Sequence, residues 1–317
     1  MTEYVSHDAV VNALDWTDLI EQLRGWFTTA NVNAPPRQVL AVPAPEESNS
    51  HQSGSLLIMP AWLPGKSVGV KVVTFFPWNA DLGQPTINAG YMLFDGSSGK
   101  LTSILDGDAL TERRTAAASA LAADYLARKN AKHHLIIGTG QLAKAVGEAY
   151  VRIRPISKTI VWGRRPEKAE EIVRDLRSAG IQAETAPDLE EACARADIVT
   201  TVTASKQPVV LGSWLRPGTH LDLIGSFRAD MRECDDQAVT QAELFVDDWA
   251  GASQAGDLSQ PLEAGLIGKK DVAADLRELC CGAHPGRRDE TSYTLFKSAG
   301  LSLEDLAAAS LAQEKRK

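Results

Sequence analysis

A glycine turn between a short apolar run and an amphipathic segment constrains the fold of this chain more than any other feature. Residues 133–137 (HHLII) are typical of a buried strand, and the residues from Gln141 onward have helical spacing. Between them, Gly138, Gly140 and Ala143 follow the order G-x-G-x-x-A. Such a turn bends sharply, lets a pyrophosphate approach the backbone and leaves free N–H groups at the helix start. It predicts binding of a nicotinamide or flavin dinucleotide.

Strand-like and helix-like segments continue to alternate beyond this turn. Helices are expected from Pro166 and over residues 189–194, and the expected strands are 159–163, 182–185, 198–203, 220–225 and 243–248. This alternation predicts an α/β fold with a doubly wound parallel sheet of the Rossmann type.

The end of the second expected strand indicates which dinucleotide is bound. An NAD site usually has Asp or Glu there, to accept hydrogen bonds from the ribose 2′-hydroxyl. Here Gly163 is followed by Arg164 and Arg165, with Lys168 a turn later. Two guanidinium groups can grip a 2′-phosphate bidentately. NADP(H) is therefore preferred and NAD(H) remains possible; the alternative is a solvated basic loop at a helix start.

Length and charge limit the other classes of function. With 317 residues and 44% hydrophobic residues, the chain can bury the cores of two domains. The net charge of −8 gives no reason to expect a nucleic-acid or membrane partner. Neither a signal peptide nor a membrane-spanning run is evident, so a cytoplasmic protein is expected. Four cysteines, of which two are adjacent, match no zinc spacing, and no metal site is expected.

Two domains are expected, one of them discontinuous. Residues 129–289 would form the dinucleotide-binding domain, and residues 1–128 with 290–317 an α+β domain for substrate binding and dimerisation. The latter would hold a helix over 8–30, a loop or edge strand within 31–53, an alanine-rich helix capped by Thr111, and a last helix opened by Ser302. Its expected strands are 55–59, 69–76, 88–95 and 100–105.

Several segments, in this order along nearly the whole chain, resemble the ornithine cyclodeaminase/mu-crystallin family. They are residues 57–61 (LIMPA), 69–74 (GVKVVT), 105–107 (LDG), 113–117 (RRTAA), 138–141 (GTGQ), 214–220 (WLRPGTH) and 294–298 (TLFKS). The resemblance implies a homodimer built through the non-Rossmann domain. It also implies chemistry on an α-amino or α-imino acid beside a nicotinamide.

Departures from the family pattern favour one of its reactions. A cyclodeaminase carries an aspartate where this chain has Phe227 and a glutamate where it has Leu57. Phenylalanine can neither accept a proton nor pair with an ammonium, so ornithine is a poor substrate. A cyclic imine such as Δ1-pyrroline-2-carboxylate or Δ1-piperideine-2-carboxylate fits better, with reduction to L-proline or L-pipecolate. Asp230 could replace the lost aspartate if the loop bends differently.

The groups expected to bind the substrate carboxylate are cationic. Arg114 lies near a helix start, where a guanidinium makes a good carboxylate clamp, and Lys71 interrupts an apolar strand. The resemblance adds Arg37 as a second arginine for the carboxylate and places Lys71 beside the reacting atoms, for electrostatic support or proton relay. Alternatives are a local pair of Arg114 with Glu112 or Asp108, a snorkelling Lys71 and a solvated Arg37.

The complete set of candidate site residues falls into three groups. Lys71 and Arg114 are the catalytic candidates. Arg37, Lys71, Arg114 and Phe227 would bind substrate. The dinucleotide would contact Gly138, Thr139, Gly140, Gln141, Leu142, Arg164, Arg165, Lys168, Thr203, Ala204, Ser205 and Ser226.

Other functions remain open at this point. Ornithine cyclodeaminase, cis-3-hydroxyproline dehydratase and alanine dehydrogenase activities occur in the family that the chain resembles. A dinucleotide-dependent binding protein without turnover is the alternative from a different class.

Overall fold

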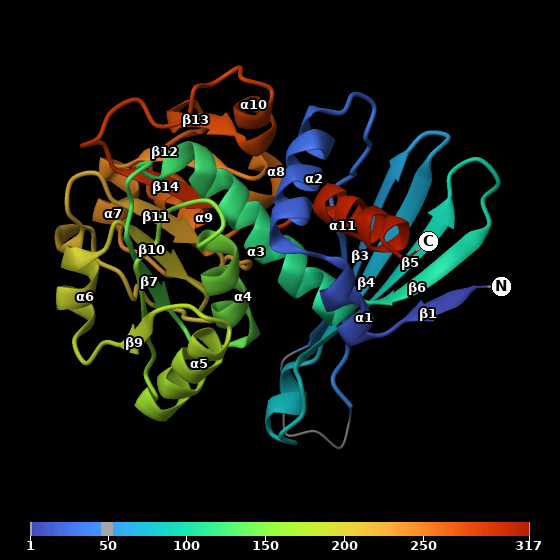
Figure 1. Cartoon of the computed structure of the whole chain (residues 1–317), viewed down its shortest axis with the longest axis horizontal. Helices are drawn as coiled ribbons and strands as arrows, with labels where there is room; N and C mark the ends of the chain where they lie inside the picture. Colours follow the sequence, from blue (N-terminus) through green and yellow to red (C-terminus); the bar gives the residue numbers. More distant parts are fainter. Residues whose placement is uncertain (1, 46–52, 317) are drawn as a thin grey trace. The chain divides into compact units, whose positions relative to one another are not determined.

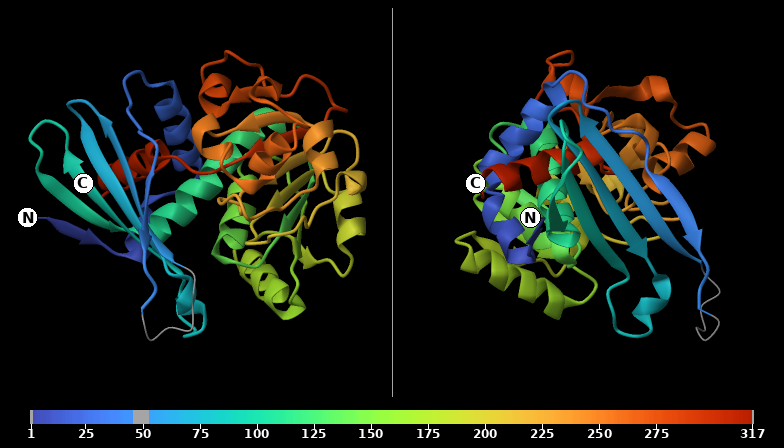
Figure 2. Two further views of the ribbon diagram at one scale, coloured as in Figure 1. Left: turned by 180° about the vertical axis from the view of Figure 1, so that it is seen from behind. Right: turned by 90° about the vertical axis from the view of Figure 1, so that its right-hand side faces the viewer.

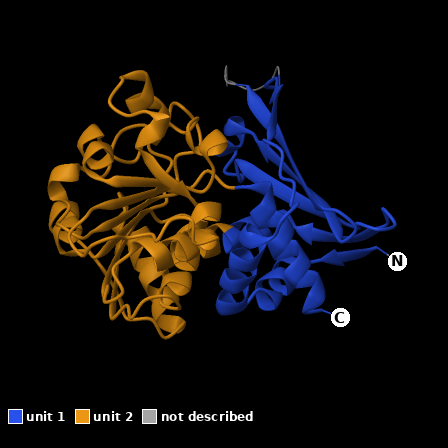
Figure 3. Ribbon diagram, turned by 90° about the horizontal axis from the view of Figure 1, so that it is seen from above, with its two compact units in different colours: residues 1–114, 301–317 blue, residues 115–300 orange. Residues whose placement is uncertain are grey.

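The computed structural model describes residues 2–45 and 53–316 and divides the chain into two compact units (Figure 3). Unit 1 comprises residues 1–114 and 301–317, and unit 2 comprises residues 115–300. The expected domain boundaries, at residues 128/129 and 289/290, remain a prediction. Part of the loop or edge strand expected within residues 31–53 lies outside the described residues.

Unit 1 is built on a mixed sheet of six strands within the described residues, in the order β1-β6-β5-β4-β3-β2 (Figure 1). Strand β1 runs parallel to β6, and the other neighbours are antiparallel. The strands are β1 (Glu3–Val5), β2 (Gln38–Val42), β3 (Gly54–Leu63), β4 (Ser67–Phe75), β5 (Ile87–Asp95) and β6 (Leu101–Asp106). The four strands expected here are confirmed, and β2 is an edge strand.

Along each strand of unit 1, successive side chains point alternately to the covered face and to the open face of the sheet. Helices α1 (His7–Ala13), α2 (Trp16–Thr28) and α11 (Ser302–Glu314) belong to this unit; α11 lies against β3, β4 and β5 on one face of the sheet (Figure 2), and α2 packs on α11. On the covered face the register aligns Val5, Leu105, Tyr91, Lys71 and Met59, and all five are buried.

Two expectations about the helices of unit 1 are wrong. The helix expected over residues 8–30 is two helices, because the Asp15 side chain accepts hydrogen bonds from the amides of Thr17 and Asp18 and starts α2. Thr111 does not cap the alanine-rich helix α3 (Gly107–Leu126). Asp106 accepts from the Ala109 amide at 2.8 Å instead, so Arg114 lies in the second turn.

Unit 2 contains a parallel sheet of eight strands within the described residues, in the order β13-β12-β14-β11-β10-β7-β8-β9 (Figure 1). The strands are β7 (His133–Ile137), β8 (Lys158–Trp162), β9 (Ala183–Thr185), β10 (Ile198–Thr201), β11 (His220–Leu223), β12 (Glu243–Val246), β13 (Val272–Asp275) and β14 (Thr294–Lys297). Chain order reverses between β7 and β10, which makes this the switch point of a doubly wound sheet. The expected Rossmann-type fold is confirmed.

Short helices connect these strands, as alternating strand and helix patterns require. They are α4 (Gln141–Tyr150), α5 (Pro166–Ser178), α6 (Leu189–Arg195), α7 (Asp236–Gln241), α8 (Trp249–Ala252), α9 (Gly256–Glu263) and α10 (Leu276–Cys280). The core of the sheet includes Leu135, Val199, Leu221, Leu244 and Leu295. No helix among the described residues is long and apolar enough to cross a bilayer.

Candidate active site

The glycine turn lies at the switch point and has the backbone that its sequence requires. Gly138 has φ +125°, and a Cβ there would lie 2.7 Å from the Val202 carbonyl oxygen, so only glycine fits. Gly140 is the N-cap of α4, and a Cβ there would meet no atom within 4 Å. The backbone at Gly140 is therefore open to an approaching group. With the positive end of α4 beside it, the turn fits a pyrophosphate.

The basic residues after β8 differ in whether they form an ion pair. Arg164 and Arg165 are exposed, and neither forms an ion pair within residues 2–45 and 53–316. Lys168 instead pairs with Glu171 on the next turn of α5, with 2.7 Å between Nζ and Oε2. Two guanidinium groups thus remain for a phosphate at the end of β8, whereas the third predicted cation is engaged by a carboxylate.

The loops after β10 and β11 are joined by one buried carboxylate, that of Glu233. Its Oε1 accepts hydrogen bonds from the Thr203 amide at 2.7 Å and the Thr203 hydroxyl at 2.8 Å. Its Oε2 accepts from the amides of Gly225 at 2.7 Å and Ser226 at 3.1 Å. The predicted cofactor residues Thr203 and Ser226 therefore share a single anchor, which the sequence analysis did not single out.

Of the two other loop candidates, Ser205 is tied by hydrogen bonds and Ala204 is exposed. The Ser205 hydroxyl donates to the Gln207 carbonyl at 2.6 Å, and the Ser205 carbonyl accepts from the Arg232 amide at 2.8 Å. Ala204 lies between Thr203 and Ser205 in this loop. The loop after β10 is thus held in one conformation by its own polar contacts and by those of Glu233.

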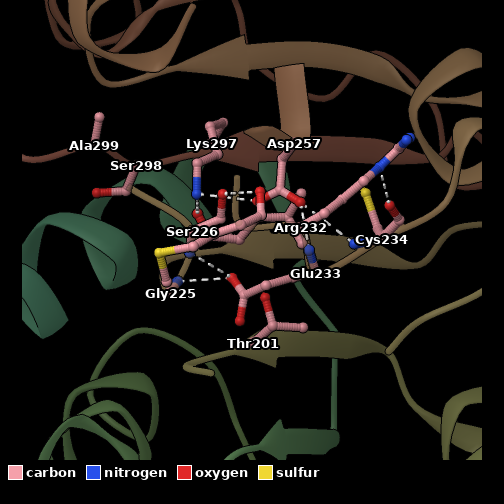
Figure 4. Close-up of polar contacts among 12 residues, drawn as sticks. Thr201, Gly225, Ser226, Arg232, Glu233, Cys234, Asp257, Lys297, Ser298 and Ala299 are labelled. Carbon is pink, nitrogen blue, oxygen red and sulfur yellow. Dashed lines mark hydrogen bonds and ion pairs between the residues drawn. The ribbon is translucent and has the colours of Figure 1, made fainter. Parts of the chain in front are cut away.

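A second charged layer supports Glu233. Asp257 on α9 accepts from the Glu233 amide at 2.7 Å, and its Oδ2 lies 3.2 Å from the Lys297 ammonium (Figure 4). Lys297 also donates to the Leu223 carbonyl at the end of β11, at 3.0 Å. The side chains of Glu233, Asp257 and Lys297 are all fully buried. In the sequence, Glu233 and Asp257 stand in polar stretches that are typical of solvated loops, so no local signal marks them.

Unit 1 buries a separate charged cluster. The Lys71 ammonium lies 2.7 Å from Asp305 Oδ1 and 3.3 Å from the Thr111 hydroxyl. Arg114 reaches the same Asp305 oxygen at 2.9 Å through Nε and Glu304 Oε2 at 2.7 Å through Nη1. Lys71 is 1% exposed, so its interpretation as a snorkelling residue is wrong. Two of the predicted substrate groups are therefore held together by carboxylates from α11.

Burial controls the electrostatics of this cluster. Burial and the neighbouring Arg114 lower the pKa of Lys71 to about 8, although Asp305 opposes the shift. Burial would raise the pKa of Asp305, but Lys71 and Arg114 outweigh it and lower this pKa. Arg37, half-buried just before β2, adds a positive charge close enough to act on Lys71. Three cationic and two acidic side chains thus leave one net positive charge, which suits a carboxylate ligand.

The residues at the cyclodeaminase positions are apolar. Phe227 is 37% exposed in the loop after β11, and Leu57 lies half-buried on β3. Asp230, the possible replacement for the missing aspartate, pairs with Arg228 at 2.8 Å and Lys206 at 3.1 Å. Its carboxylate is thus held at the surface by two cations.

Among the described residues, no group of three or more His, Cys, Asp or Glu side chains could hold a metal ion.

These features together define a class of protein. A parallel sheet with a glycine turn at its switch point makes unit 2 a dinucleotide-binding unit, and unit 1 supplies a buried Lys–Arg–carboxylate cluster. The model of the ornithine cyclodeaminase/mu-crystallin family matches residues 6–317, and the chain belongs to this family.

Relatives and solved structures agree with this assignment. The chain is 38% identical over 312 residues to a Δ1-pyrroline-2-carboxylate reductase of Paracoccus denitrificans, covering 97% of this chain and 95% of that one. The Thermococcus litoralis Δ1-pyrroline-2-carboxylate reductase in complex with NADH and L-proline superposes with a TM-score of 0.92 at 32% identity, over 99% and 97% of the two chains. An archaeal alanine dehydrogenase dimer with bound NAD gives a TM-score of 0.90 at 31% identity, over 99% and 95%.

Proposed function

We propose that this chain is an oxidoreductase that reduces a cyclic imino acid, Δ1-pyrroline-2-carboxylate or Δ1-piperideine-2-carboxylate, to L-proline or L-pipecolate with NAD(P)H. The observation that carries the proposal is the buried cluster of Lys71 and Arg114, combined with apolar Leu57 and Phe227 where a diamine substrate would need carboxylates. The reductases among its relatives and the dinucleotide complexes among its structural neighbours support it.

The predicted substrate-binding residues would have the following tasks. Arg114 and Lys71, oriented by Asp305 and Glu304, would bind the substrate carboxylate together with Arg37. Phe227 would pack against the apolar part of the ring. When bound, the reduced nicotinamide supplies the hydride.

The dinucleotide contacts of the proposal lie in unit 2. The backbone of Gly138, Thr139, Gly140, Gln141 and Leu142 would bind the pyrophosphate. Thr203, Ala204, Ser205 and Ser226, in the loops fixed by Glu233, would flank the nicotinamide.

We propose NADP(H) as the preferred cofactor, because Arg164 and Arg165 are exposed beside the turn. In the double variant Arg164→Ala/Arg165→Ala, we expect the KM for NADPH to rise about tenfold or more, since each lost charged contact costs about 1 kcal/mol or more. The KM for NADH should change by less than about twofold. Steady-state kinetics with both cofactors measures this. A wild-type enzyme that prefers NADH, or equal effects of the variant on both cofactors, contradicts the preference.

The decisive test of the function is oxidation of NADPH by the purified protein with each cyclic imine, with NADH run in parallel. Turnover with either imine establishes the reductase. Ornithine is the matched control, because its conversion to proline and ammonia without net dinucleotide oxidation would point to a cyclodeaminase and overturn the proposal. Alanine and cis-3-hydroxyproline test the two other reactions of the family.

We further propose a homodimer that forms through unit 1, and a cytoplasmic location. The dimer is supported by the open face of the sheet. There the register aligns Tyr4, Ile104, Met92, Val70 and Pro60 across five strands, and Tyr4 and Ile104 are exposed. We call these five residues the apolar row. A related archaeal alanine dehydrogenase is a dimer.

A further inference from the structure

We propose that Glu233 is a positioning residue, which locks the loops after β10 and β11 into one platform for the nicotinamide half of the dinucleotide. It would touch neither the cofactor nor the substrate. The inference rests on the proposed function because it assumes that these loops flank the nicotinamide.

The geometry makes the two loops a single body. The Glu233 carboxylate accepts from four donors in the described part of the chain, two on Thr203 and one each on Gly225 and Ser226. The backbones also touch, because a Cβ added to Gly225 would lie 2.0 Å from the Thr203 carbonyl oxygen. One loop therefore cannot shift without breaking hydrogen bonds to the other.

The buried charge is suited to this task. A carboxylate that faces only N–H and O–H donors must stay ionised to accept all of them. Burial and Asp257 raise the pKa of Glu233, whereas Lys297 and the Thr203 donors counter this shift. Asp257 also fixes the backbone of Glu233 and pairs with Lys297. Asp257 from α9, paired with Lys297 from β14, thus holds the backbone of Glu233 in place (Figure 4).

The position of the platform follows from the topology of the sheet. Ligands of doubly wound sheets bind at the carboxyl ends of the strands, at the switch point. Here the switch point lies between β7 and β10, so the loop with Thr203 is at its edge and the loop with Ser226 follows the next strand. The glycine turn after β7 is not bonded to Glu233 and serves the other half of the dinucleotide.

The variant Glu233→Gln keeps the size of the side chain but turns an NH2 group toward donors. We expect the Kd for NADPH to rise about tenfold or more, because buried donors lose their acceptor. The affinity for 2′,5′-ADP, which lacks the nicotinamide, should stay within about twofold. Hydrogen exchange without ligand should accelerate in residues 203–209 and 224–232 but not in 138–143.

The matched control is Asp197→Asn. Asp197 is also a buried carboxylate of unit 2 that accepts from backbone amides, those of Lys132 and His133 at 2.8 and 2.9 Å. It lies at the amino ends of β7 and β10, the opposite edge of the sheet from the loops. This variant should lower stability without changing the ratio of NADPH to 2′,5′-ADP affinity.

Each outcome decides the inference. The inference is overturned if Glu233→Gln weakens the binding of NADPH and of 2′,5′-ADP equally, or if it leaves NADPH binding unchanged. If the variant does not fold, Thr203→Val removes one of the four donors, and exchange must then accelerate in residues 224–232, a loop that it does not alter. If the wild-type protein binds no dinucleotide, the proposed function fails, and unchanged exchange of the two loops would still refute the coupling.

Discussion

The protonation of Lys71 is a property of a single residue that should be visible in catalysis. Burial and Arg114 lower its pKa to about 8, so the ammonium loses its proton above that pH. If the charged form binds the substrate carboxylate, kcat/KM should fall tenfold per pH unit above about 8. Lys71→Met should lower kcat/KM by about 100-fold or more and abolish this limb. Steady-state pH profiles measure both, and a limb that persists in the variant would assign it to another group.

Asp222 on β11 should make the stability of unit 2 depend on pH. Its side chain is buried, accepts from the Tyr150 hydroxyl at 2.6 Å, and has a pKa raised by burial to about 7. A raised folded-state pKa stabilises the fold fully below the unfolded pKa, near 4, and this contribution is lost as pH rises through 7. Asp222→Asn stays neutral and keeps an acceptor for Tyr150.

The difference in free energy of unfolding, Asp222→Asn minus wild type, should therefore increase by about 2 to 4 kcal/mol between pH 4 and pH 7. Above pH 7 this difference should stay constant. Urea unfolding at several pH values gives the difference. Parallel curves for the two proteins across this range would mean that Asp222 is ionised in the folded state.

Single residues with unusual chemistry were predictable, but their partners were not. Lys71 in an apolar strand is conspicuous by its charge, yet its partner Asp305 lies 234 residues away along the chain. No periodicity or motif connects such positions, because the pairing arises only when α11 packs on the sheet. Glu233 was missed for the same reason, since its donors come from loops on either side of β11.

At the scale of elements, two glycine variants in the turn between β7 and α4 should distinguish effects on stability from effects on cofactor binding. Gly138→Ala should lower the free energy of unfolding by about 2 kcal/mol or more, because φ is +125° and the methyl group would meet the Val202 carbonyl. Gly140→Ala should leave stability within about 0.5 kcal/mol, since the space around it is open.

For cofactor binding the order of the two variants should be the opposite, with a larger effect in Gly140→Ala than in Gly138→Ala. Gly140→Ala should weaken NADPH binding about tenfold or more, because its methyl group occupies the place where the pyrophosphate approaches. Thermal unfolding and NADPH titration of both variants provide the comparison. Wild-type affinity in Gly140→Ala would show that the phosphates bind elsewhere.

Elements with a clear period were predicted well and their limits less well. The strands of unit 1 were recognised as strand-like runs separated by turn residues. The helix expected over residues 8–30 is broken at Asp15, because its capping bonds compete with a continued helix. Strand β14 has four residues and inserts between β11 and β12 in the sheet. In the sequence, it is adjacent to neither of these strands. Such an insertion depends on sheet packing rather than on local pattern.

At the scale of the whole molecule, the apolar row is the feature that a lone chain would leave exposed to water. Tyr4 is 66% and Ile104 37% exposed, although both belong to an ordered sheet. Contiguous exposed apolar surface is typical of interaction sites, and this surface therefore suits the proposed dimer. The strand-like runs in the sequence could not tell which face of the sheet would be covered by helices, because both faces are rich in apolar residues.

The variant Ile104→Glu should therefore convert the proposed dimer into a monomer, since pairing two copies would bury an uncompensated carboxylate in the interface. Because Ile104 is already exposed in one chain, the fold should lose less than about 1 kcal/mol. Light scattering after size-exclusion chromatography measures the mass. Leu266→Glu is the matched control, because Leu266 is 47% exposed but belongs to unit 2 and not to the apolar row, and this variant should keep the mass of the wild type. A dimer that survives Ile104→Glu would place the interface on another surface.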